Sequence, residues 1–417
     1  MEKMVVQGGH QLNGEVSASG AKNSALILLF ASLLAEGKHR FSNVPQLMDV
    51  DSAANLLHSL GCETKRDGSN FEVLVRRPKS MEAHYDLVRK MRASILCLGP
   101  LLAKYGEAVV SLPGGCAIGT RPIDLHLEGM KALGAEIILE DGYVKAKAKK
   151  LKAATFLFET VTVGGTENIM MAASLAEGTT VMENAAKEPE IVDLANYLNK
   201  MGAKIKGAGT SVITIEGVSE LKPANHTVMA DRIEAGTLVI AGAITGGEVT
   251  VKDIRPEWID SLTFKLKEAG FKISITDNSV TVHKNKSWRA VDINTAPYPL
   301  FPTDLQAQFM SLMTVAEGTS VIGETVFENR FMHVQELCRM GADITPKTRV
   351  AVIRGKPGGL SGAPVMATDL RASACLVLAG LAARGETSVG RIYHLDRGYE
   401  KLEAKLAKLG ASVKRLG

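Results

Sequence analysis

The chain has 417 residues, of which 46% are hydrophobic and 23% charged, and its 49 basic and 45 acidic side chains give a formal net charge of +4. At roughly 150 residues a domain, this length predicts two or three globular domains, and the composition excludes a disordered chain or a dedicated nucleic-acid surface. The longest apolar run, residues 25–35, is far shorter than the ~20 residues of a membrane span and no signal-peptide core precedes it, so we expect a cytosolic protein.

The five cysteines are scattered without a Cys-x-x-Cys pair, and the nine histidines show no metal-ligand spacing. An odd number of scattered cysteines indicates reduced thiols rather than a disulfide framework. We therefore expect no metal site and no bound cofactor.

One pattern recurs six times along the chain. It consists of an apolar helix, a stop at glycine, a strand, a second helix that ends at another glycine, and further short strands. The first stops are Gly37, Gly106, Gly178, Gly247, Gly318 and Gly385. The second stops are Gly61, Gly134, Gly202, Gly270, Gly341 and Gly410. Glycine is the residue that most readily ends a helix in the left-handed conformation. Each unit of about 70 residues is longer than a common solenoid repeat, which favours globular packing.

The two helices of each unit differ in character. The first helices are apolar on most faces, which predicts that they are buried. We expect them over 21–35, 93–104, 168–177, 233–244, 305–316 and 371–383. The second helices, such as 191–201, 259–269, 332–340 and 399–409, are amphipathic. This pattern predicts an α/β protein of two domains with three units each, divided near Val228, and the first twenty residues are expected to pair with the second half.

Basic and polar side chains stand where many of these helices begin. In chain order they are Lys22 and Asn23, Arg92, Arg121 before Pro122, Asp304, Arg330, Asp369 with Arg371, and Arg397. A helix N-terminus already carries about half a positive charge, so cations there indicate a bound anion. If the helix starts share one cleft, they form a site for a phosphate or carboxylate ligand. Taken singly, each residue is equally well explained as a solvated helix start or an ion-pair partner.

Cys116 lies in a glycine-rich segment, residues 112–119, which is expected to be a loop. Arg121 is close in sequence, and a nearby guanidinium lowers a thiol pKa, so Cys116 is a candidate acid or nucleophile. The alternative, an ordinary buried cysteine, fits Cys97 and Cys375 better. The loop has neither the Gly-Lys-Ser/Thr ending of a Walker motif nor the Gly-x-Gly-x-x-Gly order of a dinucleotide site.

Two aspartates allow two interpretations. Asp304 and Asp369 are each expected either to cap the helix that follows or to act on a substrate, Asp304 as a general base. Arg371 is a possible partner of Asp369. The lysine-rich stretch 145–152 lacks interleaved aromatic residues and is interpreted as a solvated edge or loop. His394, beside Arg397, is the one histidine expected near the predicted cleft.

Seven motifs together resemble the UDP-N-acetylglucosamine 1-carboxyvinyltransferases of the enolpyruvyl transferase family. They are Gly20–Asn23, Leu112–Cys116, Gly119–Pro122, Phe301–Asp304, Glu328–Phe331, Asp369–Ala372 and Asp396–Tyr399. The resemblance spans the chain and implies a two-domain inside-out α/β barrel of six repeats. It places the domains at 22–228, which carries the Cys116 loop, and at 1–21 with 229–417, which carries Asp304, Arg371 and Arg397.

The resemblance implies transfer of the enolpyruvyl group of phosphoenolpyruvate to the 3′-hydroxyl of UDP-N-acetylglucosamine, with release of phosphate. This is the first committed step of peptidoglycan precursor synthesis. The implied mechanism is addition followed by elimination. No nucleic acid, membrane span or obligate protein partner is implied.

The resemblance also implies a role for each motif residue. Lys22, Arg121 and Arg397 are expected to hold the phosphate, with Arg330 and Arg371 near the carboxylate. Cys116 resembles the family's loop cysteine, a proposed proton donor and the target of fosfomycin, and Asp304 resembles the general base. Contacts to the sugar nucleotide are expected from Asn23, Arg92, Arg121, Pro122, Ile123, Asp124, Leu125, Thr162, Val163, Gly164 and Val326, while Asp369 joins the substrate-binding set. Thr160 stands where some family members have a lysine.

Two alternatives stay open. The same fold and anion cluster serve the related transferase that acts on shikimate 3-phosphate, although that branch lacks the Cys116 motif. The chain is alternatively a catalytically silent scaffold that keeps the repeats but not the activity.

Overall fold

The computed structural model describes residues 2–78, 80–89, 91–112 and 123–417. Within these residues the strands form six separate four-stranded sheets, and the chain divides into two compact units with three sheets each. Of the described residues, we call those within 20–112 and 123–229 the first-half unit and those within 2–19 and 230–417 the second-half unit. Because the sheets are separate, hydrogen bonding among the described strands does not close a continuous barrel.

All six sheets share one topology. In the first of them, β14 (Asn225–Thr227) pairs in parallel with β3 (Gly37–Ser42), which pairs antiparallel with β5 (Asn70–Val75), which pairs antiparallel with β4 (Glu63–Asp67). The other first-half sheets run β6 (Glu82–Ala83), β7 (Glu107–Ser111), β9 (Tyr143–Lys147), β8 (Glu136–Glu140), and β10 (Thr155–Leu157), β11 (Thr179–Glu183), β13 (Val212–Glu216), β12 (Lys204–Lys206). The repeat seen in the sequence is therefore a repeat of structure.

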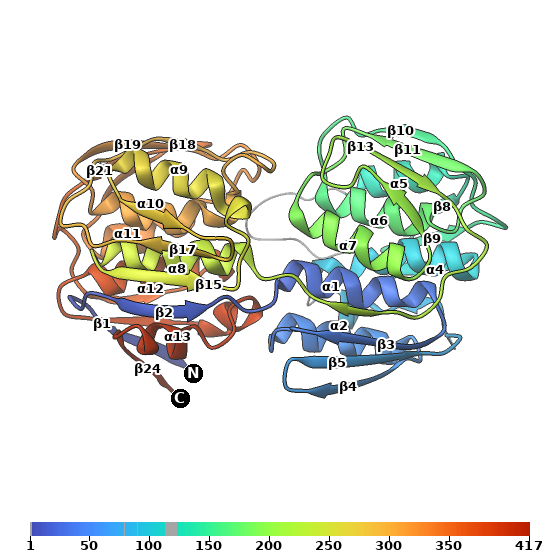
Figure 1. Ribbon diagram of the computed structural model, residues 1–417, viewed down its shortest axis with the longest axis horizontal. Coiled ribbons are helices and arrows are strands. Elements are labelled where there is room, and N and C mark those ends of the chain that lie inside the picture. Colours follow the sequence, from blue (N-terminus) through green and yellow to red (C-terminus); the bar gives the residue numbers. More distant parts are fainter. Residues whose placement is uncertain (1, 79, 90, 113–122) are drawn as a thin grey trace. The chain divides into compact units, whose positions relative to one another are not determined.

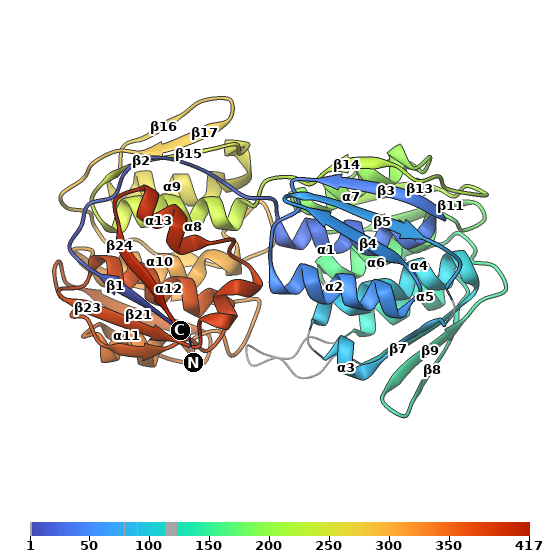
Figure 2. The ribbon, with the colours of Figure 1, turned by 90° about the horizontal axis from the view of Figure 1, so that it is seen from below.

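The chain's first strands lie in the second-half unit. β1 (Lys3–Gln7) pairs antiparallel with both β23 (Glu386–Gly390) and β24 (Ser412–Leu416), as Figure 2 shows. β2 (Asn13–Ser17) pairs in parallel with β15 (Glu248–Lys252). The three sheets run β2, β15, β17 (Ser279–Val282), β16 (Ile273–Ile275); β18 (Ile293–Asn294), β19 (Gly318–Gly323), β21 (Val350–Gly355), β20 (Asp343–Pro346); and β22 (Pro364–Met366), β23, β1, β24. The N-terminal segment thus completes two sheets formed mainly by the second half of the sequence.

Apolar helices fill the inside of each unit. In the second-half unit α8 (Arg232–Ile244), α10 (Gln306–Thr314) and α12 (Leu370–Ala382) pack on one another, and every residue of α8 is buried. In the first-half unit α4 (Leu98–Tyr105) packs on α6 (Val163–Ala173), while α1 (Lys22–Ala31) packs on the 3-10 turn η2 (Arg92–Cys97) that leads into α4. The sheets lie outside these helices (Figure 1), which is the inside-out α/β arrangement.

The second helix of each repeat has one buried face and one exposed face, as its amphipathic sequence predicts. These helices are α2 (Met48–Ser59), α5 (Asp124–Ala132), α7 (Pro189–Lys200), α9 (Asp260–Ala269), α11 (Val334–Arg339) and α13 (Leu402–Lys408). Short turns of helix also occur at α3 (Tyr85–Val88), η1 (Ser32–Leu34), η3 (Pro256–Ile259), η4 (Thr303–Leu305) and η5 (Ile392–Arg397). Both predicted helix types are thus confirmed.

Two local predictions were wrong. The third apolar helix begins at Val163 rather than 168, because Thr162 caps it by accepting a hydrogen bond from the Gly165 backbone, and it ends at Ala173 rather than 177. The glycines of its first turn lower helix propensity and obscured this start. In the fourth repeat the predicted stop, Gly247, lies one residue after the glycine that takes a positive φ, which is Gly246 with φ +65°. A Cβ on Gly247 would lie 1.9 Å from the Leu12 carbonyl oxygen, so this glycine is required by close packing.

No helix among the described residues is both long enough and apolar enough to cross a membrane.

Candidate functional site

The predicted site residues are distributed over both units. Cys116, Arg121 and Pro122 lie outside the described residues. The second-half unit holds Asp304, Val326, Arg330, Asp369, Arg371 and Arg397. The first-half unit holds Lys22, Asn23, Arg92, Ile123, Asp124, Leu125, Thr162, Val163 and Gly164.

Asp304 is clamped between two arginines. Arg330 Nη2 donates to Asp304 Oδ1 at 2.8 Å, and Arg371 Nη2 donates to Oδ2 at 3.0 Å. Both guanidinium groups are buried, whereas the Asp304 side chain is 27% exposed. Residues 26 and 67 positions away in sequence are thereby brought onto one carboxylate.

This clamp determines the protonation of Asp304. Burial by itself raises the pKa of a carboxyl group, but the charges of Arg371 and Arg330 outweigh burial and hold the pKa of Asp304 well below its usual range. The side chain caps no helix, since η4 and α10 have no side-chain cap. Of the two interpretations of Asp304, capping is therefore wrong.

Both arginines are fixed on their other sides. Arg330 Nη1 donates to Thr303 Oγ1 at 3.0 Å, and its guanidinium carbon lies 5.2 Å from the centre of the Phe327 ring. The Arg371 guanidinium lies 5.4 Å from the centre of the buried Tyr399 ring. Cation–π contacts of this kind restrict the guanidinium planes.

Asp369 caps α12. Its Oδ1 accepts hydrogen bonds from the backbone N–H groups of Arg371 and Ala372 at 2.8 and 3.0 Å. The capping interpretation of Asp369 is confirmed, and its contact with Arg371 is through the backbone. Arg371 is therefore placed at the start of α12 by a carboxylate that complements the helix dipole.

Arg397 ends η5 and is half-buried. Burial and, after it, the charge of Arg397 lower the pKa of His394, while Asp369 opposes this shift. Arg397 and Asp369 therefore both act electrostatically on His394.

Val326 is 38% exposed, and its backbone N–H donates to Glu324.

In the first-half unit, Lys22 is the first residue of α1. Its Nζ lies 2.9 Å from Oδ2 of Asp49, a buried carboxylate on α2. Asn23 follows and is exposed. The ion pair fixes the ammonium group at the positive end of the helix, where repulsion would otherwise displace it.

His126 on α5 lies close to some of the remaining described residues of this unit. Its Nδ1 lies 3.1 Å from Asn168 Nδ2, and a Cβ on Gly164 would lie 3.1 Å from its ring. Burial, helped by the charge of Arg92, lowers the pKa of His126 to about 4. The imidazole is therefore neutral at pH 7 and links α5 to α6, whose Asn168 also donates to the Ile95 carbonyl oxygen of η2. Ile123 is buried, Asp124 and Val163 are exposed, and Leu125 and Thr162 are half-buried.

Sequence reasoning missed several acidic residues that organise these groups. Asp193 on α7 accepts hydrogen bonds from Ser24 Oγ and from the Met229 backbone, and it lies 2.8 Å from His226 Nε2. It therefore ties the first turn of α1 to β14 and the segment that follows. No spacing rule links these positions, and the available signal was only that Asp193 interrupts the apolar face of a helix.

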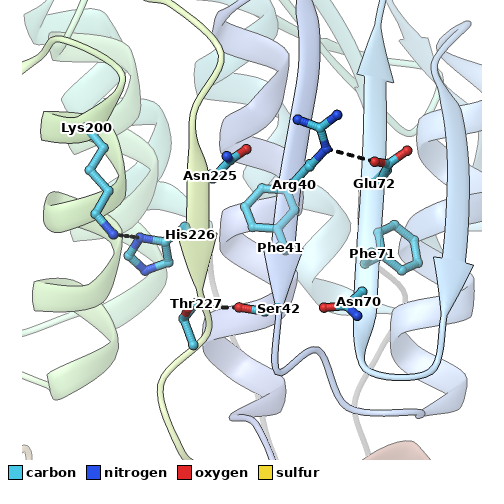
Figure 3. A pocket seen from close by; sticks show the side chains of 10 residues that line it. All are labelled: Arg40, Phe41, Ser42, Asn70, Phe71, Glu72, Lys200, Asn225, His226 and Thr227. Carbon is cyan, nitrogen blue, oxygen red and sulfur yellow. Dashed lines mark hydrogen bonds and ion pairs between the residues drawn. The ribbon is translucent and has the colours of Figure 1, made fainter.

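A separate open pocket of about 410 Å³ lies over β14, β3 and β5 beside α7 (Figure 3). It contains an Arg40–Glu72 ion pair at 2.9 Å and a contact of 3.1 Å between Lys200 Nζ and His226 Nδ1. Of the predicted site residues that the structure describes, none lines it.

Comparisons with known proteins agree over the whole chain. A family model described as EPSP synthase (3-phosphoshikimate 1-carboxyvinyltransferase) matches residues 6–406. The UDP-N-acetylglucosamine 1-carboxyvinyltransferase of Bdellovibrio bacteriovorus is 70% identical over 413 residues, which cover 99% of this chain and 100% of that protein. The protein of the same name from Trichlorobacter lovleyi is 58% identical, with 100% and 99% covered.

Solved structures show the same architecture. The enolpyruvyl transferase NikO from Streptomyces tendae superimposes with a TM-score of 0.87 at 26% identity, over 99% of this chain and 98% of that chain. An EPSP synthase from Acinetobacter baumannii has a TM-score of 0.78 at 17% identity over the full length of both chains, which shows the fold alone. The chain therefore belongs to the EPSP synthase family of enolpyruvyl transferases, and within it to the UDP-N-acetylglucosamine 1-carboxyvinyltransferases.

Proposed function

We propose that the protein transfers the enolpyruvyl group of phosphoenolpyruvate to the 3′-hydroxyl of UDP-N-acetylglucosamine and releases phosphate. The observation that carries this proposal is the identity of 70% over 99% of the chain to a relative of that name. The proposal includes a role at the first committed step of peptidoglycan precursor synthesis and a cytosolic location.

The chemistry needs an acid and a base. In the addition step C3 of phosphoenolpyruvate takes a proton, the 3′-oxygen of the sugar bonds to C2, and the hydroxyl proton passes to a base. In the elimination step C3 loses a proton, the C2–O bond to phosphate breaks, and the C2–C3 double bond forms again. We assign the acid to Cys116 and the base to Asp304.

The arginine clamp on Asp304 supports a pKa of this base that changes when phosphoenolpyruvate binds. A carboxylate held by two guanidinium groups is a weak proton acceptor, because its pKa lies well below the usual range. The carboxylate of phosphoenolpyruvate, which we assign to Arg330 and Arg371, competes with Asp304 for these guanidinium groups. Binding of this substrate therefore loosens the clamp and raises the pKa of Asp304 when a proton has to be accepted.

The other predicted site residues are assigned to the phosphate, to the carboxylate or to the sugar nucleotide. We assign phosphate binding to Lys22, Arg121 and Arg397, and carboxylate binding to Arg330 and Arg371. The sugar nucleotide is assigned to Asn23, Arg92, Arg121, Pro122, Ile123, Asp124, Leu125, Thr162, Val163, Gly164, Asp304 and Val326, and Asp369 is assigned to substrate binding without a choice between the two substrates. We further propose that the two units are the two domains of the protein, at 22–228 and at 1–21 with 229–417.

The test offers both family acceptors in parallel. Purified protein is incubated with phosphoenolpyruvate and either UDP-N-acetylglucosamine or shikimate 3-phosphate, and released phosphate is measured. We expect release with the sugar nucleotide alone. Release with shikimate 3-phosphate alone would reassign the substrate, which the description of the family model makes the second candidate. Release with neither acceptor would favour the silent scaffold.

A further inference from the structure

Glu324 is a buried carboxylate, 1% exposed, that follows β19 and receives four hydrogen bonds. Its Oε1 accepts from Thr295 Oγ1 at 2.9 Å and from the backbone N–H groups of Val326 and Phe327 at 2.9 and 3.0 Å. Its Oε2 accepts from Thr303 Oγ1 at 2.8 Å. These bonds supply the partners that a buried carboxylate requires.

The bond to Thr303 has a defined direction. Thr303 has a single hydroxyl hydrogen, and it donates this hydrogen to Glu324 Oε2. The oxygen lone pairs of Thr303 are then available to Arg330 Nη1, which donates to them at 3.0 Å. Arg330 uses its other terminal nitrogen on Asp304. Glu324, Thr303, Arg330 and Asp304 thus form one chain of hydrogen bonds, in which Arg330 donates in both directions, to Asp304 and through the Thr303 hydroxyl toward Glu324.

Glu324 also holds Arg330 from a second side. Its two backbone hydrogen bonds shape the turn that carries Phe327, and the Phe327 ring lies 5.2 Å from the Arg330 guanidinium carbon. One buried carboxylate therefore fixes both the hydroxyl and the aromatic ring that determine where this guanidinium lies.

We propose that Glu324, acting through Thr303, is a positioning residue that holds the Arg330 guanidinium on Asp304. This inference rests on the proposed function, because it assigns Arg330 to the carboxylate of phosphoenolpyruvate. Loss of the link allows Arg330 to leave the geometry needed for that anion, whereas the sugar nucleotide keeps its contacts.

The first test compares Thr303→Val with Thr303→Ser. Valine keeps the shape but lacks the hydroxyl, and serine keeps the hydroxyl. Because a hydrogen bond to a charged group contributes roughly a tenfold to hundredfold effect, we expect T303V to lower kcat/KM for phosphoenolpyruvate by at least about tenfold. T303S should stay within about threefold of the parent, and the KM for UDP-N-acetylglucosamine should change little in both.

Thr295→Val is the matched control. It removes the hydroxyl that donates to the other oxygen of Glu324 and that accepts from the Thr325 backbone N–H, and this hydroxyl forms no hydrogen bond with Arg330. If Thr303 has a merely structural role, T303V and T295V should lower the thermal unfolding midpoint and kcat/KM for both substrates in parallel. This result would overturn the inference. A selective effect of T303V on phosphoenolpyruvate supports it.

The second test uses Glu324→Gln. Its amide N–H₂ faces Thr303 and so removes the acceptor that directs the hydroxyl. If the residues act in one chain, E324Q combined with T303V should be no worse than about threefold below the stronger single variant. Independent, multiplied losses would refute the relay. Turnover of the parent protein with UDP-N-acetylglucosamine, measured first, separates failure of this inference from failure of the proposed function.

Discussion

Substitution of Arg371 by methionine tests the clamp on Asp304. Methionine keeps much of the aliphatic volume of arginine but removes the guanidinium that donates to Asp304 Oδ2 at 3.0 Å. Arg330 remains on the other oxygen at 2.8 Å. The variant thus leaves the carboxylate in place with one cation instead of two.

The magnitude follows from the geometry. Loss of an adjacent opposite charge raises a carboxyl pKa by roughly 1–3 units, with each unit equal to about 1.4 kcal/mol. Breaking a fully buried pair costs ~3–5 kcal/mol. Asp304 is 27% exposed and keeps Arg330, so we expect a cost below that of a fully buried pair and near the lower end of the range from the pKa shift, about 1–2 kcal/mol of unfolding free energy at pH 7.

The assay is urea unfolding of the parent, R371M, D304N and the double variant between pH 7 and pH 3. The folded pKa of Asp304 is depressed, so its stabilisation is present above the ordinary carboxyl pKa of about 3.9 and is lost as the pH falls through the folded value. The stability difference between the parent and R371M should therefore be full at pH 7 and should narrow as the pH falls below about 4.

Arg354→Met is the matched control, because Arg354 pairs with Asp343 at 3.0 Å on an exposed surface. We expect it to cost less than about 0.5 kcal/mol. A difference between the parent and R371M that does not depend on pH, or a double-variant cycle without coupling between Arg371 and Asp304, would refute the reasoning.

Four further predictions address other groups. Asp193→Asn weakens an acceptor shared by three hydrogen-bond partners and should lower the unfolding free energy by ~1–3 kcal/mol; chemical denaturation that shows no change would contradict this. Because the pKa of His126 is lowered to about 4, the unfolded chain binds a proton near pH 6.5 that the folded chain does not; stability should fall by about 3 kcal/mol between pH 6.5 and 4, and less in His126→Asn. Arg397→Ala should raise the apparent KM for phosphoenolpyruvate at least about tenfold, and an unchanged value in steady-state kinetics would remove Arg397 from the site. Cys116→Asp should keep some turnover but lose the fosfomycin adduct in mass spectrometry, and complete inactivity would contradict simple replacement of the acid.

The repeat architecture was predictable from the sequence because it depends on local rules. Apolar helices that must be buried and glycines that end helices repeat at regular spacing, and Gly61 and Gly270 take the positive φ that this role requires. The start of α6 was missed because Gly164 and Gly165 weaken the local helix signal. Here a threonine cap and packing within the unit determine the boundary.

The site was only partly predictable. Its charged residues were found because they precede helices, but their pairing depends on contacts between distant segments, such as Asp304 with Arg371. The sequence offered two interpretations of Asp304 and Asp369, and only coordinates separate a capping carboxylate from a clamped one. Glu324 was missed because a buried acid that serves backbone and hydroxyl donors has no motif.

Product analysis tests the central claim most directly. Phosphoenolpyruvate labelled with ¹³C at C2 and C3 is turned over with UDP-N-acetylglucosamine, and the product is examined by NMR. The account predicts an enolpyruvyl ether on the 3′-oxygen of the sugar, formed together with an equal amount of free phosphate. Label that stays in phosphoenolpyruvate, or that enters an acceptor other than the sugar nucleotide, would contradict it.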